Sequence, residues 1–446
     1  MDLNGAKALV VGMKKSGIAS AELLAREGAS VRATDLKPLE ELPEAAALVK
    51  RLGIPFAQQS TDVFEGVDLI VLSPDVPADL APLQEARRRG VQVIGEIELA
   101  GPFLKGNTIG ITGSNGKTTT TSLVGHVLRH AGLVVQVGGN IGTPVTAMID
   151  TSSADGWNVL ELSSFQLETI IAFHAQIGLA LNVTQNHLDR HHEFENYAAA
   201  KSRLFENMGP SDFAVLNADD PVCVSFAKRT AATAQWFSST HKVTPGASLC
   251  GDKLVLDGKL LMTAQEIPIR GRHNIENVLA AAIAAVRAGV NRETIAEAVR
   301  SFRAVEHRLE FVRNVSGVDF YNDSKATSVD ATLKALEAFR GNVWLILGGK
   351  DKGLDYSALR EPLAAKAHAV LLIGAAAPKI AGYLDGAVPL IDAKTMDQAV
   401  AGAYREAQPG DTVLLAPACA SFDQFRSFEH RGEVFKQLVN ALESKN

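Results

Sequence analysis

Short apolar segments of strand length alternate with longer helix-like segments along almost the whole chain. This alternation is typical of α/β domains built on parallel sheets, and it constrains the fold more than any other feature of the sequence. The chain has 446 residues, which is too many for one core. At about 150 residues per domain, the length predicts three domains.

The expected elements fall into three groups along the chain. The strands expected in the first group are Ala6–Gly12, Ser30–Thr34, Leu69–Leu72 and Val91–Ile94, with a helix over Ser16–Glu27. Those expected in the second are Thr108–Thr112, Val134–Val137, Trp157–Leu162, Ile177–Leu181 and Phe213–Leu216, with helices Thr118–Ala131, Tyr197–Glu206, Asn274–Ala288 and Arg292–Phe302. The turn-rich stretch Gln235–Pro268 predicts a β insertion. The third group has strands Val343–Leu347, Ala369–Ile373 and Thr412–Leu415.

We therefore predict an α/β protein of three domains. Residues 1–95 form an N-terminal Rossmann-like domain, and residues 96–304 form a central domain with a P-loop ATPase-type parallel sheet. Residues 305–446 form a C-terminal Rossmann-like domain.

Composition excludes several classes of partner. The net charge is −6, so no broad basic field favours nucleic acid or an anionic membrane as a main partner. Met1–Gly12 lacks the basic region and cleavage site of a signal peptide, and apolar runs such as Val278–Val286 are too short to cross a bilayer. Three widely spaced cysteines fit a reducing cytosol. We expect a cytoplasmic protein without membrane insertion.

A glycine-rich loop, Gly113-Ser-Asn-Gly-Lys-Thr118, follows an expected strand and begins an expected helix. Glycines let backbone N–H groups converge on phosphate oxygens, and the helix N-terminus adds its dipole. Lys117 can reach the β- and γ-phosphates, and the Thr118 hydroxyl can bind Mg²⁺. Ile111 stands at the first glycine position of GxxxxGK[ST], so the general pattern is not met. A plain turn that starts a helix is the alternative, and the strand–loop–helix context favours nucleotide binding.

Polar residues at the ends of the next strands suggest a metal site. Glu161 ends an apolar strand beside the loop, where a ligand of a hard cation is expected. His187 follows another strand, although a lone histidine is as often structural. By composition alone, Lys201 is typical of a solvated lysine on a helix.

These segments resemble the motifs of a known family, the Mur ligases. The matching blocks in the first two thirds are Thr112-Gly-Ser-Asn-Gly-Lys-Thr-Thr119, Glu161-Leu-Ser-Ser-Phe-Gln166, Asn182-Val-Thr-Gln-Asn-His-Leu-Asp-Arg190, Ala199-Ala-Lys201 and Arg272-His-Asn-Ile-Glu-Asn277. The later ones are Glu306-His-Arg308, Asn322-Asp-Ser-Lys-Ala-Thr327, Gly348-Gly-Lys-Asp-Lys352, Pro417-Ala-Cys-Ala-Ser-Phe-Asp-Gln-Phe425 and Phe428-Glu-His-Arg-Gly432. The last three blocks are similar to those of the D-glutamate-adding member. The resemblance covers nearly the whole chain.

The resemblance implies an ATP-dependent ligase that activates a carboxylate as an acyl phosphate and joins it to an amine. The implied substrates are UDP-N-acetylmuramoyl-L-alanine and D-glutamate, the implied cofactors are ATP and two Mg²⁺ ions, and we expect a monomer. In the family, the first domain binds the UDP substrate, the second ATP, and the third the amino acid.

The resemblance also implies roles for single residues. Lys117, His187 and Lys201 are the implied catalytic residues, and Lys201 matches a lysine that CO₂ carbamylates. The implied metal ligands are Thr118, Glu161, His187 and Lys201. The implied ATP contacts are Gly113, Ser114, Asn115, Gly116, Lys117, Thr118, Thr119, Asn277, Arg308 and Asp323. The implied contacts of the UDP substrate are Ser16, Gly17, Asp35, Ser73 and Asn140, and those of D-glutamate are Thr327, Lys352, Ser421 and Phe428.

The chain departs from the family at two places in its first domain. The glycine-rich loop, taken alone, also fits two alternative functions. The turn Gly12–Gly17 lacks the middle glycine of GxGxxG, and Asp75 stands where a glycine is usual. The phosphate loop also occurs in folylpolyglutamate synthases, which the block Phe428–Gly432 and the nucleotide-like first domain disfavour. A regulatory P-loop NTPase is disfavoured by the two further domains and the absence of a switch sequence.

Overall fold

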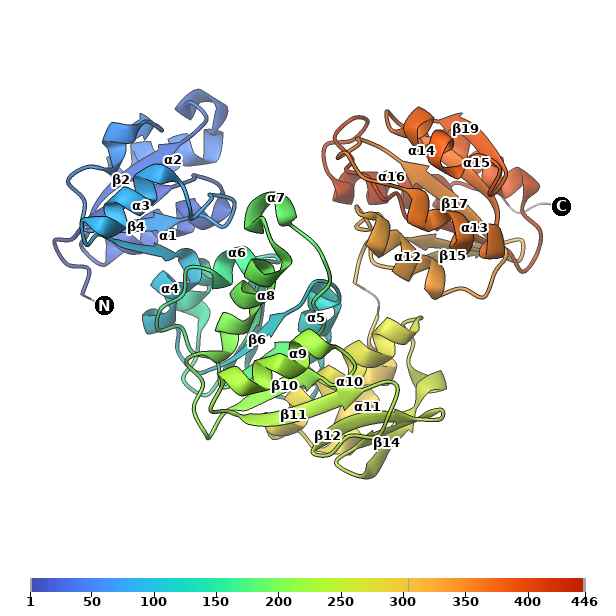
Figure 1. Ribbon diagram of the computed structural model, residues 1–446, viewed down its shortest axis with the longest axis horizontal. Helices are drawn as coiled ribbons and strands as arrows, with labels where there is room; N and C mark the ends of the chain where they lie inside the picture. The colour runs from blue at the N-terminus through green and yellow to red at the C-terminus, as the bar shows by residue number, and fades with distance from the viewer. Residues whose placement is uncertain (1, 304, 444–446) are drawn as a thin grey trace. The chain divides into compact units, whose positions relative to one another are not determined.

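The computed structural model describes residues 2–303 and 305–443, and those residues contain three β-sheets (Figure 1). The chain divides into two compact units, Met1–Ala264 with Glu276–Val299, and Gln265–Ile275 with Arg300–Asn446. The first unit holds sheets of five and nine strands, and the second holds a sheet of six strands. The predicted α/β class with three sheet-based domains is confirmed. Within the described residues, no helix is long and apolar enough to cross a membrane.

The first sheet is parallel throughout, in the order β3-β2-β1-β4-β5. Its strands are β1 (Lys7–Val11), β2 (Ser30–Asp35), β3 (Phe56–Gln58), β4 (Leu69–Leu72) and β5 (Gln92–Gly95). Alternate side chains of β1 pack on opposite faces: Ala8 and Val10 in a core with α1 (Lys15–Arg26) and α2 (Pro43–Leu52), and Leu9 and Val11 in a core with α3 (Ala81–Arg88). Burial on both faces explains why these strands are almost wholly apolar.

The central sheet has the order β14-β13-β12-β11-β10-β9-β6-β8-β7. Its first strands in sequence are β6 (Asn107–Thr112), β7 (Val135–Gly139), β8 (Trp157–Glu161), β9 (Ile177–Ala180), β10 (Phe213–Asn217) and β11 (Thr233–Ser238). The predicted β insertion is confirmed in its strand content. Its strands β12 (Gly246–Cys250), β13 (Lys253–Leu256) and β14 (Lys259–Thr263) extend the same sheet rather than forming a separate one, and β13 and β14 run antiparallel.

Helices between these strands carry much of the candidate site. They include α5 (Lys117–His130), which begins at the glycine-rich loop, α8 (Phe194–Ser202) and α10 (Arg272–Arg287). Shorter helices α6 (Ser164–Leu167) and α7 (Leu188–His191) follow β8 and β9. The helix expected over Tyr197–Glu206 begins three residues earlier and ends in a short 3₁₀ turn, Arg203–Phe205.

The sheet of the second unit has the order β15-β16-β20-β17-β18-β19. The strands are β15 (Glu310–Val315), β16 (Val318–Asn322), β17 (Val343–Gly348), β18 (Ala367–Ile373), β19 (Leu390–Lys394) and β20 (Thr412–Leu415). One face packs with α12 (Val329–Glu337) and α14 (Ala377–Leu384), and the other with α15 (Met396–Glu406) and α16 (Phe428–Asn440). The last strand in sequence, β20, lies between β16 and β17, so the sheet reverses its order there. Ligands bind at such switch points in open α/β sheets.

The turn between β1 and α1 depends on a close glycine contact. A Cβ atom on Gly17 would lie 1.8 Å from the carbonyl oxygen of Gly12. We predict that Gly17→Ala lowers the free energy of unfolding of the first domain by about 1–3 kcal/mol, because the backbone must move to admit the methyl group. Differential scanning calorimetry measures the change. The control is Gly382→Ala in α14, where an added Cβ meets nothing within 4 Å. That variant should be as stable as wild type or more so, and an unchanged midpoint for Gly17→Ala would contradict the prediction.

Candidate active site

The glycine-rich loop connects β6 to α5 with a backbone that suits glycine at two positions. Gly113 has φ 154° and Gly116 has φ 84°. A Cβ on Gly116 would lie 2.4 Å from Oδ1 of Asn277. Asn182, at the end of β9, holds the loop: its Oδ1 accepts from the N–H of Asn115 at 2.9 Å, and its Nδ2 donates to the Asn115 carbonyl at 3.1 Å. Hydrogen bonds from Asn182 therefore help to fix the shape of the loop.

Two lysine amines meet at one carbonyl of this loop. Lys117 Nζ donates to the Gly113 oxygen at 2.8 Å and to the Ser114 oxygen at 3.1 Å. Lys201 Nζ donates to the same Gly113 oxygen at 2.8 Å, and the residue is 1% exposed. Burial, and then the charge of Lys117, lowers the pKa of Lys201 well below its ordinary value.

The expectation from composition that Lys201 is a solvated helix lysine is wrong. Its face of α8 packs into the core, and its amine lies 4.5 Å from the centre of the Tyr197 ring. A buried amine with a lowered pKa gives up its proton more readily than the amine of an exposed lysine.

A buried carboxylate lies beside the loop at the end of β8. Glu161 is 2% exposed, and its Oε1 accepts from Asn140 Nδ2 at 2.8 Å. Within the described residues, its Oε2 is buried without a hydrogen-bond partner. Thr118 is also buried, at 4% exposed. A bare carboxylate oxygen and a hydroxyl suit a hard cation such as Mg²⁺.

In the part of the chain that the structure describes, no three His, Cys, Asp or Glu side chains come together as a metal cluster. Any Mg²⁺ held by Thr118 and Glu161 would therefore take further oxygens from elsewhere, such as phosphate and water. Mg²⁺ commonly keeps this mixed coordination.

His187 is exposed and immediately precedes α7, with φ 54°. Its ring lies 4.9 Å from the Phe165 ring and 6.2 Å from the Tyr197 ring. The Tyr197 hydroxyl is 3.0 Å from the Ser114 hydroxyl in the phosphate loop. His187 is thus placed near the loop through Tyr197. Tyr197 and Asn182 were not predicted as site residues, although Asn182 lies in one of the motif blocks and Tyr197 lies next to another.

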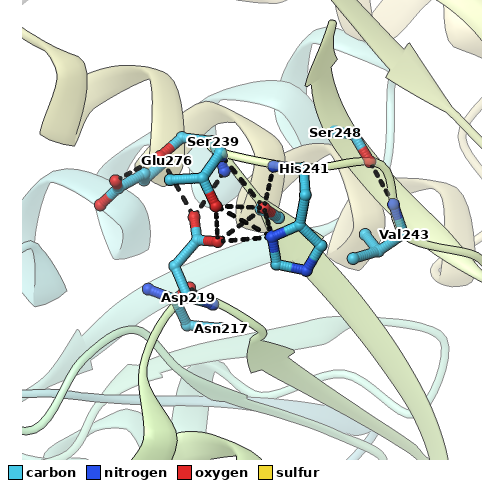
Figure 2. A network of polar contacts seen from close by, with 9 residues as sticks. Asn217, Asp219, Ser239, His241, Val243, Ser248 and Glu276 are labelled. Carbon is cyan, nitrogen blue, oxygen red and sulfur yellow. Dashed lines mark hydrogen bonds and ion pairs between the residues drawn. The ribbon is translucent and has the colours of Figure 1, made fainter.

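A polar network ties the carboxyl ends of β10 and β11 to α10 (Figure 2). Asp219 accepts from the N–H of Ser239 at 2.7 Å, and the Ser239 hydroxyl donates to Glu276 at 2.7 Å. The next residue, Asn277, accepts from the Thr120 hydroxyl at 3.1 Å. The network thereby holds Asn277 against the start of α5.

The first sheet contributes a cleft of about 520 Å³, and the structure brings three predicted substrate residues to it: Ser16, Ser73 and Asn140. Gly17 lies beneath the turn, against the Gly12 carbonyl. Asp35 lines an adjacent cavity of about 350 Å³ and accepts from the N–H of Met13 at 2.7 Å.

Asp75, where the family usually has glycine, lines both cavities and has no positive φ. Its carboxylate pairs with Lys14 at 2.7 Å, and both side chains are exposed. The aspartate therefore fits the loop without backbone strain. The neighbouring carbonyl of Val76 accepts from Arg190 at 2.7 Å.

In the second unit, three motif loops converge at the ends of β16, β17 and β20. The N–H of Lys350 donates to the Ala420 oxygen at 2.8 Å, and the N–H of Ala418 donates to the Ala326 oxygen at 2.9 Å. Lys352 Nζ lies 3.3 Å from the Thr327 oxygen. The segments that carry the predicted amino-acid residues Thr327, Lys352 and Ser421 are therefore brought together at the switch point of the sheet.

Phe428 begins α16, and its carbonyl accepts from the Ser324 hydroxyl at 2.8 Å. Arg308 and Asp323 lie together in the second unit, whereas Asn277 lies in the first. Asp323 is 8% exposed, and burial raises its pKa to about 7 although the charge of Arg308 opposes the shift.

A phosphate loop after a parallel strand, a buried lysine and a bare carboxylate define a nucleotide-binding α/β enzyme. Comparison with known sequences is consistent with this class. Residues 6–95 match the family profile "Mur ligase MurD-like, N-terminal domain", residues 111–285 match "Mur ligase middle domain", and residues 307–419 match "Mur ligase, glutamate ligase domain".

Two relatives that match this chain over nearly its full length carry the same name. A protein of Solibacter usitatus named UDP-N-acetylmuramoylalanine--D-glutamate ligase is 75% identical over 100% of both chains. A protein of the same name from Acidobacterium capsulatum is 52% identical over 99% of this chain and 97% of its own. The chain belongs to the Mur ligase family, and it is an ATP-dependent ligase that forms a C–N bond.

Solved structures share the fold at low identity. UDP-N-acetylmuramate-alanine ligase MurC from Thermotoga maritima is 19% identical with a TM-score of 0.62, over 98% of this chain and 99% of its own. A pseudomurein peptide ligase type C from Methanothermus fervidus is 19% identical with a TM-score of 0.61, over 98% and 100%.

The raised pKa of Asp323 gives a prediction on stability. Its folded pKa of about 7 lies above the ordinary 3.8, so its contribution to stability is fully present below pH 3.8 and is lost as the pH rises through 7. Asp323→Asn stays neutral, so the thermal midpoint of the variant minus that of wild type should increase from pH 5 to pH ~8. Differential scanning calorimetry without ligands measures it, with the exposed Asp385→Asn as control. A difference that stays constant with pH would refute the prediction.

Proposed function

We propose that this protein joins D-glutamate to UDP-N-acetylmuramoyl-L-alanine, with ATP, in the synthesis of peptidoglycan precursors. The observation that carries the proposal is the pair of lysine amines on the Gly113 carbonyl, because it combines a phosphate loop with a buried, reactive lysine. The name of the full-length relatives supplies the substrates.

Each proposed domain binds a different substrate. Residues 1–95 bind the UDP substrate, residues 96–304 bind ATP, and residues 305–446 bind the amino acid. We further propose that the protein acts as a monomer in the cytoplasm and binds neither nucleic acid nor membrane.

The reaction must overcome the low electrophilicity of a carboxylate. Transfer of the γ-phosphoryl group of ATP to the substrate carboxylate gives an acyl phosphate and ADP. The amine of D-glutamate then attacks the acyl carbon, the amide C–N bond forms, a proton leaves the amine, and phosphate departs. Phosphoryl transfer needs positioning and charge neutralisation more than covalent help. Lys117 is the residue proposed to stabilise the transferring group, and the proposed contacts of the phosphates are Gly113, Ser114, Asn115, Gly116 and Thr119.

The residues at the loop fit Mg²⁺ in two proposed sites. Thr118 and Glu161 would hold one ion, which the partnerless Glu161 Oε2 supports. His187 and Lys201 would hold the second. Bound Mg²⁺ neutralises negative charge on the phosphates. Asn277, Arg308 and Asp323 are the proposed contacts of the rest of ATP.

We propose that Lys201 is carbamylated. The ammonium first loses one proton; the lone pair of the neutral amine then attacks CO₂, a second proton leaves the nitrogen, and an anionic carbamate remains. The burial and lowered pKa of Lys201 support this step, because only the neutral amine reacts. The resulting carbamate has oxygens that suit a metal.

For the UDP substrate, the proposed contacts are Ser16, Gly17, Asp35, Ser73 and Asn140. Ser16 lies in the first turn of α1, whose N-terminus favours an anion such as a diphosphate. Asp35 is the acceptor proposed for the nucleoside end. For D-glutamate, the proposed contacts are Lys352, Thr327, Ser421 and Phe428, and a lysine with two hydroxyls suits two carboxylates.

Amino-acid choice tests the proposal. Purified protein should release phosphate from ATP with UDP-N-acetylmuramoyl-L-alanine and D-glutamate, and not with L-alanine or a diamino acid. Lys352→Ala should raise the KM for D-glutamate about ten- to a hundredfold, since a lost hydrogen bond to a charged group costs about 1.5–3 kcal/mol. The KM for ATP should change little.

Lys350→Ala is the matched control, because its exposed side chain lies on the same loop. Preference for another amino acid would replace D-glutamate in the proposal. An effect of Lys352→Ala on ATP alone would remove Lys352 from the amino-acid site.

The carbamate gives a separate prediction. Lys201→Ala should lose nearly all activity, and short-chain carboxylates should restore part of it by supplying oxygens in place of the carbamate. Phosphate-release rates with and without added formate or acetate measure the rescue. Lys228→Ala serves as the control, since it lies outside the site and should respond to neither change. Full activity of folded Lys201→Ala would reject the modification.

A further inference from the structure

Arg431 is a buried cation in the block Phe428–Gly432, and none of the roles proposed above involves it. It lies in the first turn of α16, is 0% exposed, and is among the largest fully buried side chains of the described residues. Nε donates to the Ser324 hydroxyl at 2.9 Å, Nη2 to the Ser324 carbonyl at 2.7 Å, and Nη1 to the Cys419 carbonyl at 3.1 Å. The guanidinium therefore bridges two loops that are far apart in sequence.

Stability alone gives little reason for this arginine. All three hydrogen-bond acceptors are neutral, whereas a buried charge is usually paired with an opposite one. Within the described residues, the charge of Asp423 acts on Arg431 without a hydrogen bond or ion pair and does not overcome the effect of burial on its pKa. Burial lowers the pKa of Arg431 to about 10, so it stays charged at neutral pH. The first turn of a helix also favours anions over cations. An apolar side chain of similar volume would avoid both costs.

Residues that surround Arg431 also contact one another. The Ser324 hydroxyl, which accepts from Arg431, donates in turn to the Phe428 carbonyl at 2.8 Å. Gly349, with φ 139°, approaches from a third loop: a Cβ there would lie 2.3 Å from the Ala420 oxygen and 3.3 Å from Arg431 Nη1. The loops after β16, β17 and β20 thus pack around one side chain.

Each of these contacts lies next to a residue of the proposed amino-acid site. Ser324 is three residues before Thr327, Gly349 is three before Lys352, and Cys419 is two before Ser421. The carbonyl of Phe428 accepts a hydrogen bond from the Ser324 hydroxyl. A side chain that fixes Ser324 and Cys419 therefore limits the movement of all four residues.

We infer that Arg431 is a positioning residue, which hydrogen-bonds the loops after β16 and β20 and lies beside Gly349 of the loop after β17, so that Thr327, Lys352, Ser421 and Phe428 are preorganised for a dicarboxylate amino acid. The inference rests on the proposed function for the identity of that amino acid. Arg431 does not touch the substrate in this arrangement. Arg431 restrains the loops before the amino acid binds, so less conformational entropy is lost on binding.

Kinetic constants of variants test the inference. Arg431→Lys keeps the charge but cannot reach both loops, and Ser324→Ala removes one anchor without leaving a new charge. Both should raise the KM for D-glutamate about tenfold and leave the KM for ATP and for the UDP substrate within about twofold. Arg313→Lys is the control, because Arg313 also donates to two carbonyls, those of Asn440 and Leu442, away from these loops.

A purely structural role would lower the thermal midpoint or change all three KM values together, and either pattern without a selective rise for D-glutamate would overturn the inference. If Arg431→Lys does not fold, Ser324→Ala decides. If wild type uses D-glutamate and both variants keep its KM, the positioning role fails while the proposed function stands. If wild type uses another amino acid, the proposed function fails, and the positioning role is judged on the KM for that amino acid.

Discussion

The carbonyl of Gly113 accepts hydrogen bonds from two lysine amines, and the central site depends on this contact. Burial first, and then the charge of Lys117 on the same carbonyl, lowers the pKa of Lys201. Gly113 itself has φ 154°, a backbone conformation that L side chains rarely adopt. Asn182 and Tyr197 then hold the rest of the loop around it. The lowered pKa of Lys201 thus depends on how the chain is folded around it.

The carboxyl ends of parallel strands explain why the site residues gather where they do. The phosphate loop follows β6, Glu161 ends β8, and Asn182 follows β9, all neighbours in the central sheet. In the second unit, the motif loops follow β16, β17 and β20, which are also adjacent. Parallel strands direct successive loops to the same edge, so residues distant in sequence meet without long-range matching of side chains. Arg431 adds a bridge between such loops.

Much of the fold could be predicted because its signals are local. Apolar runs predicted β1, β6, β9 and β17 nearly to their ends, since strands buried on both faces contain few polar residues. The β15–β16 hairpin was not predicted. Edge strand β15 is largely exposed or half-buried and carries Glu310, Arg313 and Asn314, so it has no such run. The turn-rich stretch that became β12–β14 showed strand content but not which sheet it would join.

In the candidate site too, some features could be predicted from the sequence and others could not. The loop and its lysine, Lys117, could be assigned from glycine spacing between a strand and a helix, because backbone conformation there is a local property. The sequence by itself also determined the α/β class and, through its blocks, the family. Only the tertiary structure decided that Lys201 is buried, that Glu161 has an unsatisfied oxygen, and that Arg431 bridges two loops. Lys201 meets Gly113 across 88 residues of sequence. Burial and pKa depend on every group that displaces water around an atom, and those groups come together only when the chain has folded.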